Sequence, residues 1–342
     1  MATITAIPGD GVGPEVVGEA LRTLEALSLD LDVDVLDHVN ADTYLDTGTA
    51  LSDDDFERVR SSAGTLLGAV GDARAAGTDY ARSVLLRLRF DLDLYVNYRP
   101  AKLLHDRLSP LRSESDRPID CVIVRENTEG LYAGVGGSLR PDTQHETATD
   151  SEISTYHGVS RIIDFAFSIA RRAVCMVDKS NAVRFGGRLW QRCWGEARSR
   201  FPDVDHSHLY VDAAAMKLVS DPTGFDVIVT NNSYGDILSD LAAELAGGVG
   251  AATSANINGA TGFGLYEPVH GTAPDIAGKG IANPVGAILT SALMIERLGF
   301  RDEAAAVRTA VDRTVAAGTV TPDFGGRSST AQVGDAIRAE LP

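Results

Sequence analysis

The pattern that most constrains the fold is an alternation of short apolar runs with segments of helical periodicity. Four runs are typical of buried strands: TITAI at 3–7, CVIV at 121–124, AVCMV at 173–177 and DVIVT at 226–230. Helical spacing is found at 15–27, 160–173 and 283–300. The alternation predicts an α/β fold. Because 342 residues are too many for one typical core, two domains are expected.

Polar residues follow three of these strands directly. The tails read REN at 125–127, DKSN at 178–181 and NNSYGD at 231–236. In open α/β sheets, ligands bind beyond the carboxyl ends of the strands. The three tails therefore predict a functional site. The segment 131–152, rich in glycine and without helical period, indicates an arm or an insertion.

Two aspartates in the third tail need a positive partner. Asp236 and Asp240 are four residues apart, so on a helix both carboxylates lie on one face. Like charges at this spacing repel by roughly 0.2–0.5 kcal/mol. The pair thus indicates that a cation binds there.

The charge of the chain is strongly acidic and poor in lysine. Its formal net charge is −17, with 33 Asp against 15 Glu and 4 Lys against 27 Arg. This balance argues against nucleic acid or anionic membranes as partners, because both need a basic face. The composition resembles that of proteins from salt-loving organisms, where salt screens self-repulsion; an ordinary acidic enzyme is the alternative. In so lysine-poor a chain, each remaining lysine is a functional candidate.

The sequence predicts a cytoplasmic protein. It has no run of about 18 apolar residues that would span a membrane, and its first residues lack the basic start and apolar core of a signal peptide. Cys121, Cys175 and Cys193 are far apart and form no CxxC motif, so we expect them to be small core residues.

The N-terminal stretch PGDGVG, residues 8–13, follows a strand and opens a helix. Its glycines at 9, 11 and 13 give G-x-G-x-G and not the G-x-G-x-x-G of a Rossmann fingerprint. We therefore expect a tight turn near a ligand and not a standard Rossmann site.

A group of cations accompanies the acidic residues. Arg89, Arg99 and Arg125 are fork-shaped donors suited to carboxylates, although any one of them alone is more typical of a solvated surface. Together with Tyr132, Lys179 and the aspartate pair, they favour a metal-bound substrate with several carboxylates, with an acid and a base nearby.

These motifs resemble those of the β-decarboxylating dehydrogenases of malate-type substrates, the family of 3-isopropylmalate, isocitrate, homoisocitrate and tartrate dehydrogenases. IPGDGVGPEV, YVNYRPAK, VRENTEGLY, DKSN, YVDAAAM, GDILSDLA and YEPVHGTAPDIAGKGIANP occur in the family's order over nearly the whole chain. The resemblance implies an NAD-binding terminal domain from 1–94 and 247–342. It also implies a central domain, 95–246, with a dimerisation arm at about 131–152. The expected assembly is a homodimer with shared active sites, possibly a tetramer.

Carried over position by position, the resemblance assigns roles to the site residues. Asp236 and Asp240 would bind Mg²⁺ or Mn²⁺ with Asp212 of the neighbouring subunit, and hard oxygen ligands suit these ions. Asp212 and Asp236 would also lie against the substrate, whose carboxylates Arg89, Arg99 and Arg125 would clamp. Lys179, also from the partner, would take the hydroxyl proton, Tyr132 would protonate the enolate, and Asn181 would orient the substrate.

The resemblance also locates the cofactor. The implied dinucleotide contacts are Glu267, His270, Gly271, Thr272, Ala273, Asp275, Ile276 and Asn283. A carboxylate at Asp275 can accept hydrogen bonds from a ribose but repels a 2′-phosphate. NADP-using relatives have a lysine and a tyrosine at the positions of Asp275 and Ile276, so the expected cofactor is NAD.

Substrate choice is expected from the segment before Arg89. Leu85 and Leu86 would form an apolar wall, where isocitrate enzymes have Asn and homoisocitrate enzymes have Arg. The expected reaction is therefore oxidation and decarboxylation of (2R,3S)-3-isopropylmalate to 4-methyl-2-oxopentanoate and CO₂, in leucine biosynthesis. Homoisocitrate, isocitrate, malate or tartrate remain alternatives, because VRENTEGLY is commoner in isocitrate and homoisocitrate enzymes. More remote alternatives are a Mg²⁺-dependent phosphohydrolase and a nucleotide-binding protein.

Overall fold

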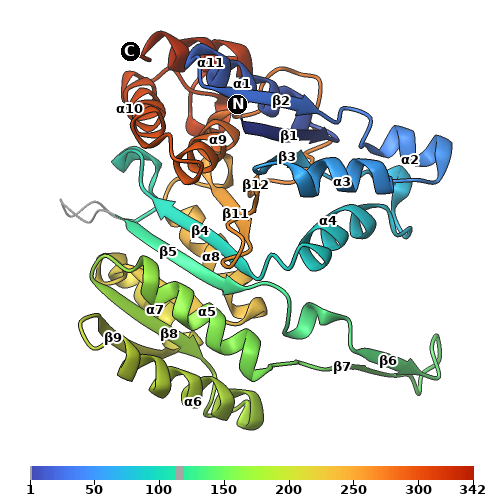
Figure 1. The fold of residues 1–342 in the computed structure, drawn as a ribbon, viewed down its shortest axis with the longest axis vertical. Coiled ribbons are helices and arrows are strands. Elements are labelled where there is room, and N and C mark those ends of the chain that lie inside the picture. Colours follow the sequence, from blue (N-terminus) through green and yellow to red (C-terminus); the bar gives the residue numbers. More distant parts are fainter. Residues whose placement is uncertain (1, 112–118) are drawn as a thin grey trace. The chain divides into compact units, whose positions relative to one another are not determined.

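The computed structural model describes residues 2–111 and 119–342, and the chain divides into two compact units. Unit 1 consists of Met1–Leu94, Lys102–Ser113 and Ala243–Pro342, and unit 2 of Tyr95–Ala101 and Glu114–Ala242. Each unit is a sheet with helices on both faces (Figure 1). The α/β class predicted from the sequence is therefore confirmed. The functional roles predicted for the two domains stay predictions.

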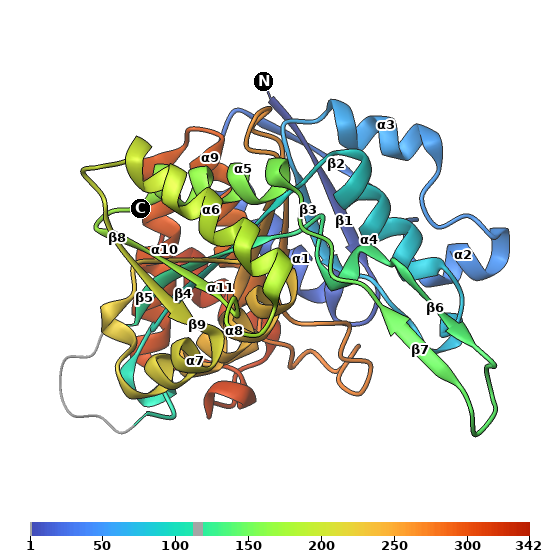
Figure 2. The same ribbon diagram turned by 90° about the horizontal axis from the view of Figure 1, so that it is seen from below.

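Unit 1 is built on five strands in the order β2-β1-β3-β12-β11. Their bounds are Leu31–Val35, Ala2–Gly9, Thr65–Ala69, Gly264–Pro268 and Thr253–Ile257. All neighbours are parallel except β11 and β12. On one face lie α1 (Gly13–Ala26) and α9 (Val285–Arg297), backed by α10 (Arg301–Ala317) and α11 (Thr330–Ala339). On the other lie α2 (Ala41–Thr47), α3 (Asp53–Ser61) and α4 (Tyr80–Asp91) (Figures 1 and 2).

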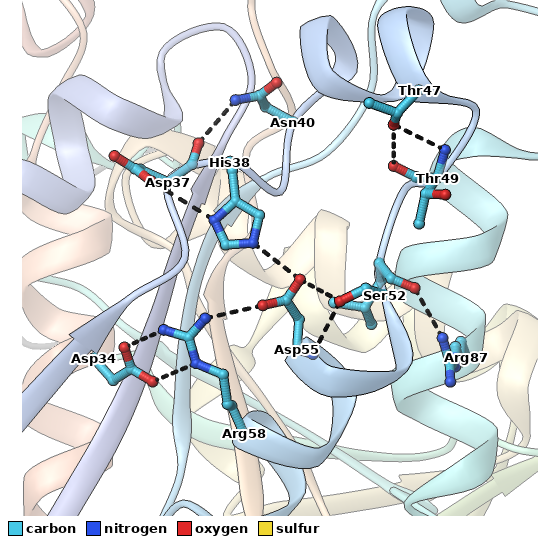
Figure 3. Close-up of polar contacts among 11 residues, drawn as sticks. Asp34, Asp37, His38, Asn40, Thr47, Thr49, Ser52, Asp55, Arg58 and Arg87 are labelled. Atoms are coloured by element: carbon cyan, nitrogen blue, oxygen red, sulfur yellow. Dashed lines mark hydrogen bonds and ion pairs between the residues drawn. The ribbon is translucent and has the colours of Figure 1, made fainter.

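Side-chain pairs reinforce the outer edge of unit 1, between β2 and α3 (Figure 3). Asp55, on α3, is largely buried and accepts hydrogen bonds from Ser52 Oγ at 2.6 Å, His38 Nε2 at 2.9 Å and Arg58 Nη1 at 3.0 Å. Arg58 also donates from Nε to Asp34 on β2 at 2.9 Å. Burial raises the pKa of Asp55, but the hydrogen bonds from Ser52 and His38 outweigh it and hold that pKa below its ordinary value.

Unit 2 is built on strands in the order β4-β5-β10-β8-β9. Their bounds are Val96–Lys102, Asp120–Glu126, Val227–Thr230, Ala173–Asp178 and Asp205–Tyr210. The neighbours from β5 to β9 are all parallel. On one face lie α5 (Tyr156–Ile169) and α6 (Arg184–Arg200), and on the other α7 (Val211–Ser220) and α8 (Asn232–Leu245) (Figure 2).

The glycine-rich segment at 131–152 forms a hairpin. Strands β6 (Gly136–Leu139) and β7 (Thr147–Asp150) pair antiparallel, and every residue in both is exposed. At its base, Gly130 and Ile153 exchange backbone hydrogen bonds of 2.9 and 3.3 Å. Because a lone two-stranded ribbon is marginally stable in water, this shape is typical of an arm that packs against another surface. Its predicted role in dimerisation stays a prediction.

The local predictions from periodicity are confirmed. The runs at 3–7, 121–124 and 173–177 fall in β1, β5 and β8, and the run at 226–230 covers β10 and the residue before it. The helical segments overlap α1, α5 and α9, although α5 begins and ends about four residues earlier than predicted. Cys121, Cys175 and Cys193 are buried free thiols, as expected for core residues. Within the described ranges, the helices are too short or too polar to cross a bilayer.

Candidate active site

The polar tails of unit 2 meet at one edge of its sheet. Thr230, the last residue of β10, pairs in register with Arg125 on β5 and with Val177 on β8. Asp178, the last residue of β8, pairs with Tyr210 on β9. Because the strands are parallel, the segments that follow them leave the sheet on the same side, as the sequence predicted.

Arg125 is the most buried cation of this edge. Only 4% of its side chain is exposed, and its Nη1 donates to Asp236 Oδ1 at 2.6 Å. Its Nε and Nη2 both donate to Asn232 Oδ1, at 2.9 and 2.6 Å. A Cβ at Gly235 would lie 2.6 Å from Arg125 Cβ. The glycine in NNSYGD is therefore required, since only it lets the arginine pass so close to α8.

Arg99 forms an ion pair with the second aspartate, Asp240, as Arg125 does with Asp236. It lies on β4, with 15% of its side chain exposed, and its Nη1 donates to Asp240 Oδ1 at 2.8 Å and to Ser239 Oγ at 3.1 Å. Its Nε donates to Asn97 Oδ1 at 2.9 Å. Both carboxylates that the helical spacing brings together are thus compensated by an arginine. The pairing leaves both guanidinium groups and both carboxylates along the N-terminal two-thirds of α8.

Tyr132 joins the same cluster. It lies in a short 3₁₀ turn, Leu131–Ala133, and its hydroxyl donates to Asp236 Oδ2 at 3.3 Å. The guanidinium of Arg125 is 5.7 Å from the centre of its ring. Partial burial, together with the charge of Asp236, raises the pKa of Tyr132 above its ordinary value. The phenol is therefore protonated at neutral pH and can act as a proton donor.

Lys179 and Asp212 form a separate pair in unit 2. Lys179 directly follows β8, Asp212 is in the first turn of α7, and Nζ is 2.5 Å from Oδ1. The hydrogen bond from Lys179 holds the pKa of Asp212 below its ordinary value. Asn181, in the same turn as Lys179, is exposed. Across 2–111 and 119–342, three or more acidic, His or Cys side chains nowhere gather as a metal site. One chain thus does not bring Asp212 into a cluster with Asp236 and Asp240.

The N-terminal loop PGDGVG anchors the segment predicted to bind the cofactor. Asp10 is buried and accepts hydrogen bonds from Ala41 N at 2.7 Å, Gly71 N at 2.8 Å and the Tyr80 hydroxyl at 2.7 Å. Val12 N donates to Thr272 O at 2.9 Å. The tight turn expected here is therefore present, and its backbone bonds directly to the loop that follows β12.

Backbone geometry makes Gly11 essential to this contact. Its φ is +60°, a conformation that L side chains rarely adopt. A Cβ at this position would lie 1.9 Å from Thr272 O. On the other side of the contact, Ala273 has a φ of +41°, which is unusual for a residue with a side chain. The loop is thus held in a strained shape by its neighbours.

The remaining predicted cofactor residues lie around this loop. His270 Nε2 is buried, and no protein group among the described residues bonds to it; burial lowers the pKa of the imidazole, which is therefore neutral. Asp275 is exposed and Ile276 is half-buried. Asn283 is buried, and its amide donates to Asp323 at 2.9 Å. Glu267 accepts from Asn256 at 2.8 Å.

The predicted substrate wall lies on α4. Leu85, Leu86 and Arg89 are all half-buried. Leu85 packs against the hydrophobic core of unit 1, which contains Leu88 and Val84 from the same helix. Part of its role is therefore structural, and Leu86 is the better candidate for contact with a ligand.

Comparison with known proteins identifies the family. The profile described as isocitrate/isopropylmalate dehydrogenase matches residues 3–337. The chain belongs to the isocitrate/isopropylmalate dehydrogenase family. A 3-isopropylmalate dehydrogenase of Clavibacter sepedonicus is 47% identical over 350 residues, covering 99% of this chain and 98% of the relative. One of Corynebacterium efficiens is 45% identical over 344 residues, covering 99% of each.

Solved structures agree with this family membership. An isocitrate dehydrogenase from Methylococcus capsulatus superimposes with a TM-score of 0.89 at 38% identity, covering 99% of each chain. The apo form of a β-decarboxylating dehydrogenase from Thermococcus kodakarensis gives 0.84 at 36% identity, covering 99% of this chain and 96% of the other. The two-domain dehydrogenase fold expected from the motifs is therefore confirmed, and the chain is a decarboxylating dehydrogenase.

Several residues that support the candidate site were not predicted from the sequence. Asn232, Ser239 and Asn97 position the two arginines, and Asp10 holds the N-terminal loop. Asn232 and Ser239 are polar residues within NNSYGDILSD, the stretch that also contains Asp236 and Asp240. Their position in that stretch was the available signal, whereas the partners of Asp10 are 31 to 70 residues away and gave none.

Proposed function

We propose that the protein oxidises and decarboxylates 3-isopropylmalate with NAD, in the synthesis of leucine. The observation that carries this proposal is the joint presence of the acidic, arginine and tyrosine cluster on α8 and of near full-length relatives named 3-isopropylmalate dehydrogenase. The isocitrate dehydrogenase among the structural relatives is less similar in sequence, at 38% identity.

The arginines supply the recognition of the substrate's two carboxylates. Arg99 and Arg125 are held by side chains of unit 2, so their guanidinium planes are oriented before a substrate arrives. Charge-assisted bidentate hydrogen bonds are roughly twice as strong as neutral ones. Arg89 completes the predicted clamp from α4. Binding of an acid requires that the arginines exchange part of their present bonding to Asp236 and Asp240 for the substrate.

Two groups transfer the protons: Lys179 accepts one and Tyr132 donates one. Lys179 accepts the proton of the substrate hydroxyl as the C2 hydride leaves, and a β-keto acid results. The bond from C3 to the departing carboxylate then breaks, and its electrons form an enolate. Tyr132 protonates C3 of that enolate, and its raised pKa keeps the phenol protonated beforehand.

The donor set fits a hard divalent cation, Mg²⁺ or Mn²⁺. Asp236 and Asp240 offer oxygen ligands on one helix face. The described residues of a single chain do not bring a third acidic ligand to them, so we assign that ligand to Asp212 of the partner subunit. When bound, the cation would stabilise negative charge on the substrate oxygen.

The loop after β12 fits a dinucleotide. His270 Nε2 is a buried polar atom that lacks a protein partner among the described residues, and a Cβ at Gly271 would meet nothing within 4 Å, so a ligand can approach the backbone closely. The exposed carboxylate of Asp275 suits ribose hydroxyls and disfavours a 2′-phosphate. We therefore assign NAD, which would accept the hydride.

The proposed active unit is a homodimer that shares its sites. Lys179 and Asp212 would serve the partner's substrate, and the exposed β6–β7 hairpin would contribute to the interface. Two chains of net charge −17 repel each other. Salt screens this repulsion beyond the Debye length, which is ~10 Å at 0.1 M and ~3 Å at 1 M. We therefore expect dimer mass and turnover to fall together as KCl is lowered from molar concentrations. A fully active dimer in dilute buffer would contradict the salt-adapted interpretation.

A substrate panel tests the proposal directly. NADH formation is measured with NAD, Mn²⁺ and each of 3-isopropylmalate, isocitrate, homoisocitrate, malate and tartrate. We expect the highest kcat/KM with 3-isopropylmalate. Leu86→Arg should reduce that value and admit homoisocitrate, whereas Leu86→Met conserves apolar volume and should change little. Preference of the wild-type protein for any other acid would overturn the substrate assignment.

A further inference from the structure

Asp178, which the mechanism does not use, is a buried carboxylate next to Lys179. It is 4% exposed and accepts hydrogen bonds at both oxygens. His208 Nε2 is 2.8 Å from Oδ1, Ser180 N donates to Oδ1 at 3.1 Å and Gln191 Nε2 donates to Oδ2 at 2.8 Å. A buried charge is costly unless it is paired and hydrogen-bonded. These contacts tie together β8, β9 and α6.

His208 joins the two segments that carry the Lys179–Asp212 pair. It lies on β9, two residues before Tyr210 and four before Asp212. Its ring makes an edge contact with the Tyr210 ring, with centroids 5.2 Å apart at 89°. The ammonium of Lys179 lies 5.8 Å from the centre of the same Tyr210 ring. His208 therefore contacts Asp178, the residue before Lys179, and also Tyr210, whose ring lies beside the Lys179 ammonium.

The turn that carries Lys179 is otherwise held through its backbone. The carbonyl of Lys179 accepts hydrogen bonds from Ala182 N at 2.9 Å and Val183 N at 2.8 Å. A Cβ at Gly187 would lie 2.5 Å from the Cα of Ser180, so α6 presses directly on this turn. The side chain of Lys179 is thus placed by a turn whose base is the Asp178 carboxylate.

We propose that His208 is a positioning residue for Lys179. Through its hydrogen bond to Asp178, it fixes the ends of β8 and β9 relative to each other, and so sets where the ammonium lies beside Asp212. This proposal rests on the proposed function in assigning a proton-transfer role to Lys179. The placement itself is independent of which malate-type acid is the substrate.

Two variants separate the hydrogen bond from the bulk of the ring. Gln at position 208 carries a donor at about the place of imidazole Nε2, whereas Asn carries its donor nearer to Nδ1 and falls short of Asp178. His206→Ala is the matched control, because His206 is exposed on the same strand. Each variant is assayed as the full chain with saturating Mn²⁺ and NAD. Melting temperature and amide hydrogen exchange at Ala182 and Val183 are measured in parallel.

We expect His208→Asn to lower kcat by about 10- to 100-fold with little change in KM, as for misplaced catalytic groups. His208→Gln and His206→Ala should keep kcat within about threefold by the same reasoning. Exchange at Ala182 and Val183 should be faster in His208→Asn alone. A wild-type kcat and exchange rate in His208→Asn would overturn the proposal. So would equal losses in the Asn and Gln variants.

The exchange measurement also separates the two proposals. If the wild-type protein oxidises none of the malate-type acids, the proposed function fails. The amide exchange of the three variants still shows whether His208 fixes the turn. If the wild-type protein is active but exchange and kcat are unchanged in His208→Asn, only the positioning role fails.

Discussion

The two units hold their functional groups by different physical means. In unit 2 the groups are side chains that hold one another by charge, as in Arg125 with Asp236, Arg99 with Asp240 and Lys179 with Asp212. In unit 1 the loop that follows β12, which is proposed to bind the cofactor, is held by backbone, through the bond from Val12 to Thr272 and the close approach at Gly11.

The difference matches what each region is proposed to do. Charged side chains can exchange partners when a substrate or cation arrives, at an energy cost of a few hydrogen bonds. A backbone loop cannot rearrange so cheaply, because its positive φ values and contacts leave one shape available. Unit 2 is thus suited to chemistry in which charges move, and unit 1 to binding a ligand of constant shape.

Removal of the proposed base should give the largest effect in unit 2. Lys179→Met keeps the length of the side chain but cannot accept a proton, so kcat should fall by about 10²- to 10⁴-fold. Affinity for NAD should stay within about twofold, since the dinucleotide contacts are assigned to unit 1. Stopped-flow turnover and calorimetric titration of NAD measure the two quantities.

Lys217→Met is the control for this variant, because Lys217 is an exposed lysine on α7, with its ammonium 5.6 Å from the Phe225 ring. It should retain turnover. An unchanged kcat in Lys179→Met would exclude this lysine from the chemistry.

A steric change should have the corresponding effect in unit 1. Gly11→Ala places a Cβ 1.9 Å from Thr272 O and forces a side chain into a φ of +60°. Strain of this kind costs about 1–3 kcal/mol. If the loop absorbs it, NAD affinity should fall about tenfold or more, since 1.4 kcal/mol is a factor of ten. The kcat at saturating NAD should change less.

Gly18→Ala provides the control for Gly11→Ala. Gly18 lies within α1, and a Cβ there would have only Arg22 Nη2 near it, at 4.0 Å. Alanine favours a helix by about 1 kcal/mol over glycine, so this variant should be slightly more stable and bind NAD normally. Normal NAD affinity in Gly11→Ala would show that the loop tolerates displacement.

A smaller effect is expected from charge within unit 1. Asp275→Lys with Ile276→Tyr replaces the carboxylate that suits ribose hydroxyls by a cation that suits a 2′-phosphate. The ratio of kcat/KM for NADP to that for NAD should rise by at least about tenfold, which corresponds to one favourable ion pair. Asp302→Lys, an exposed position on α10, makes the same change of charge as a control. An unchanged ratio would place the adenosine elsewhere.

The comparison also explains which parts of the site could be predicted from the sequence. Lys179 directly follows β8, Arg125 is the second-last residue of β5, and Asp236 lies on the helix that follows β10. The helical spacing of Asp236 and Asp240 is likewise a local property. Local spacing is readable in a sequence. The partner of each aspartate is not, because Arg99 and Asp240 are separated by 141 positions and meet only through the sheet order.

The same limit applies to residues whose role is structural support. His208 was not predicted, because its bond to Asp178 depends on the parallel register of β8 and β9. Leu85 and Leu86 were predicted together as a wall, yet only Leu85 packs against the core of unit 1. Adjacent residues on a helix point about 100° apart, and the sequence did not say which one faces the interior.

The smallest effect tests whether side-chain pairs in unit 1 serve stability alone. Asp55 has a pKa below its ordinary value of 3.8, mainly through Ser52 and His38, which outweigh its burial. A carboxyl whose pKa is lowered on folding stabilises the native state above pH 3.8. That contribution is lost as the pH falls through the lowered pKa. Asp55→Asn should therefore lower the free energy of unfolding by about 1–2 kcal/mol at pH 7.

The deficit of Asp55→Asn should shrink toward zero below that pKa, because the wild-type carboxyl is then also neutral. Denaturant unfolding at pH 7 and in steps down to pH 3 measures it. Asp37→Asn is the control, since its carboxylate is exposed and 3.8 Å from His38 Nδ1. NAD affinity at pH 7 should be the same in all three proteins, because the Asp55 cluster holds the β2–α3 edge and not the backbone contact at Thr272. A loss of NAD affinity in Asp55→Asn would mean that charge pairs and backbone contacts in unit 1 act as one system, contrary to the contrast between the two units.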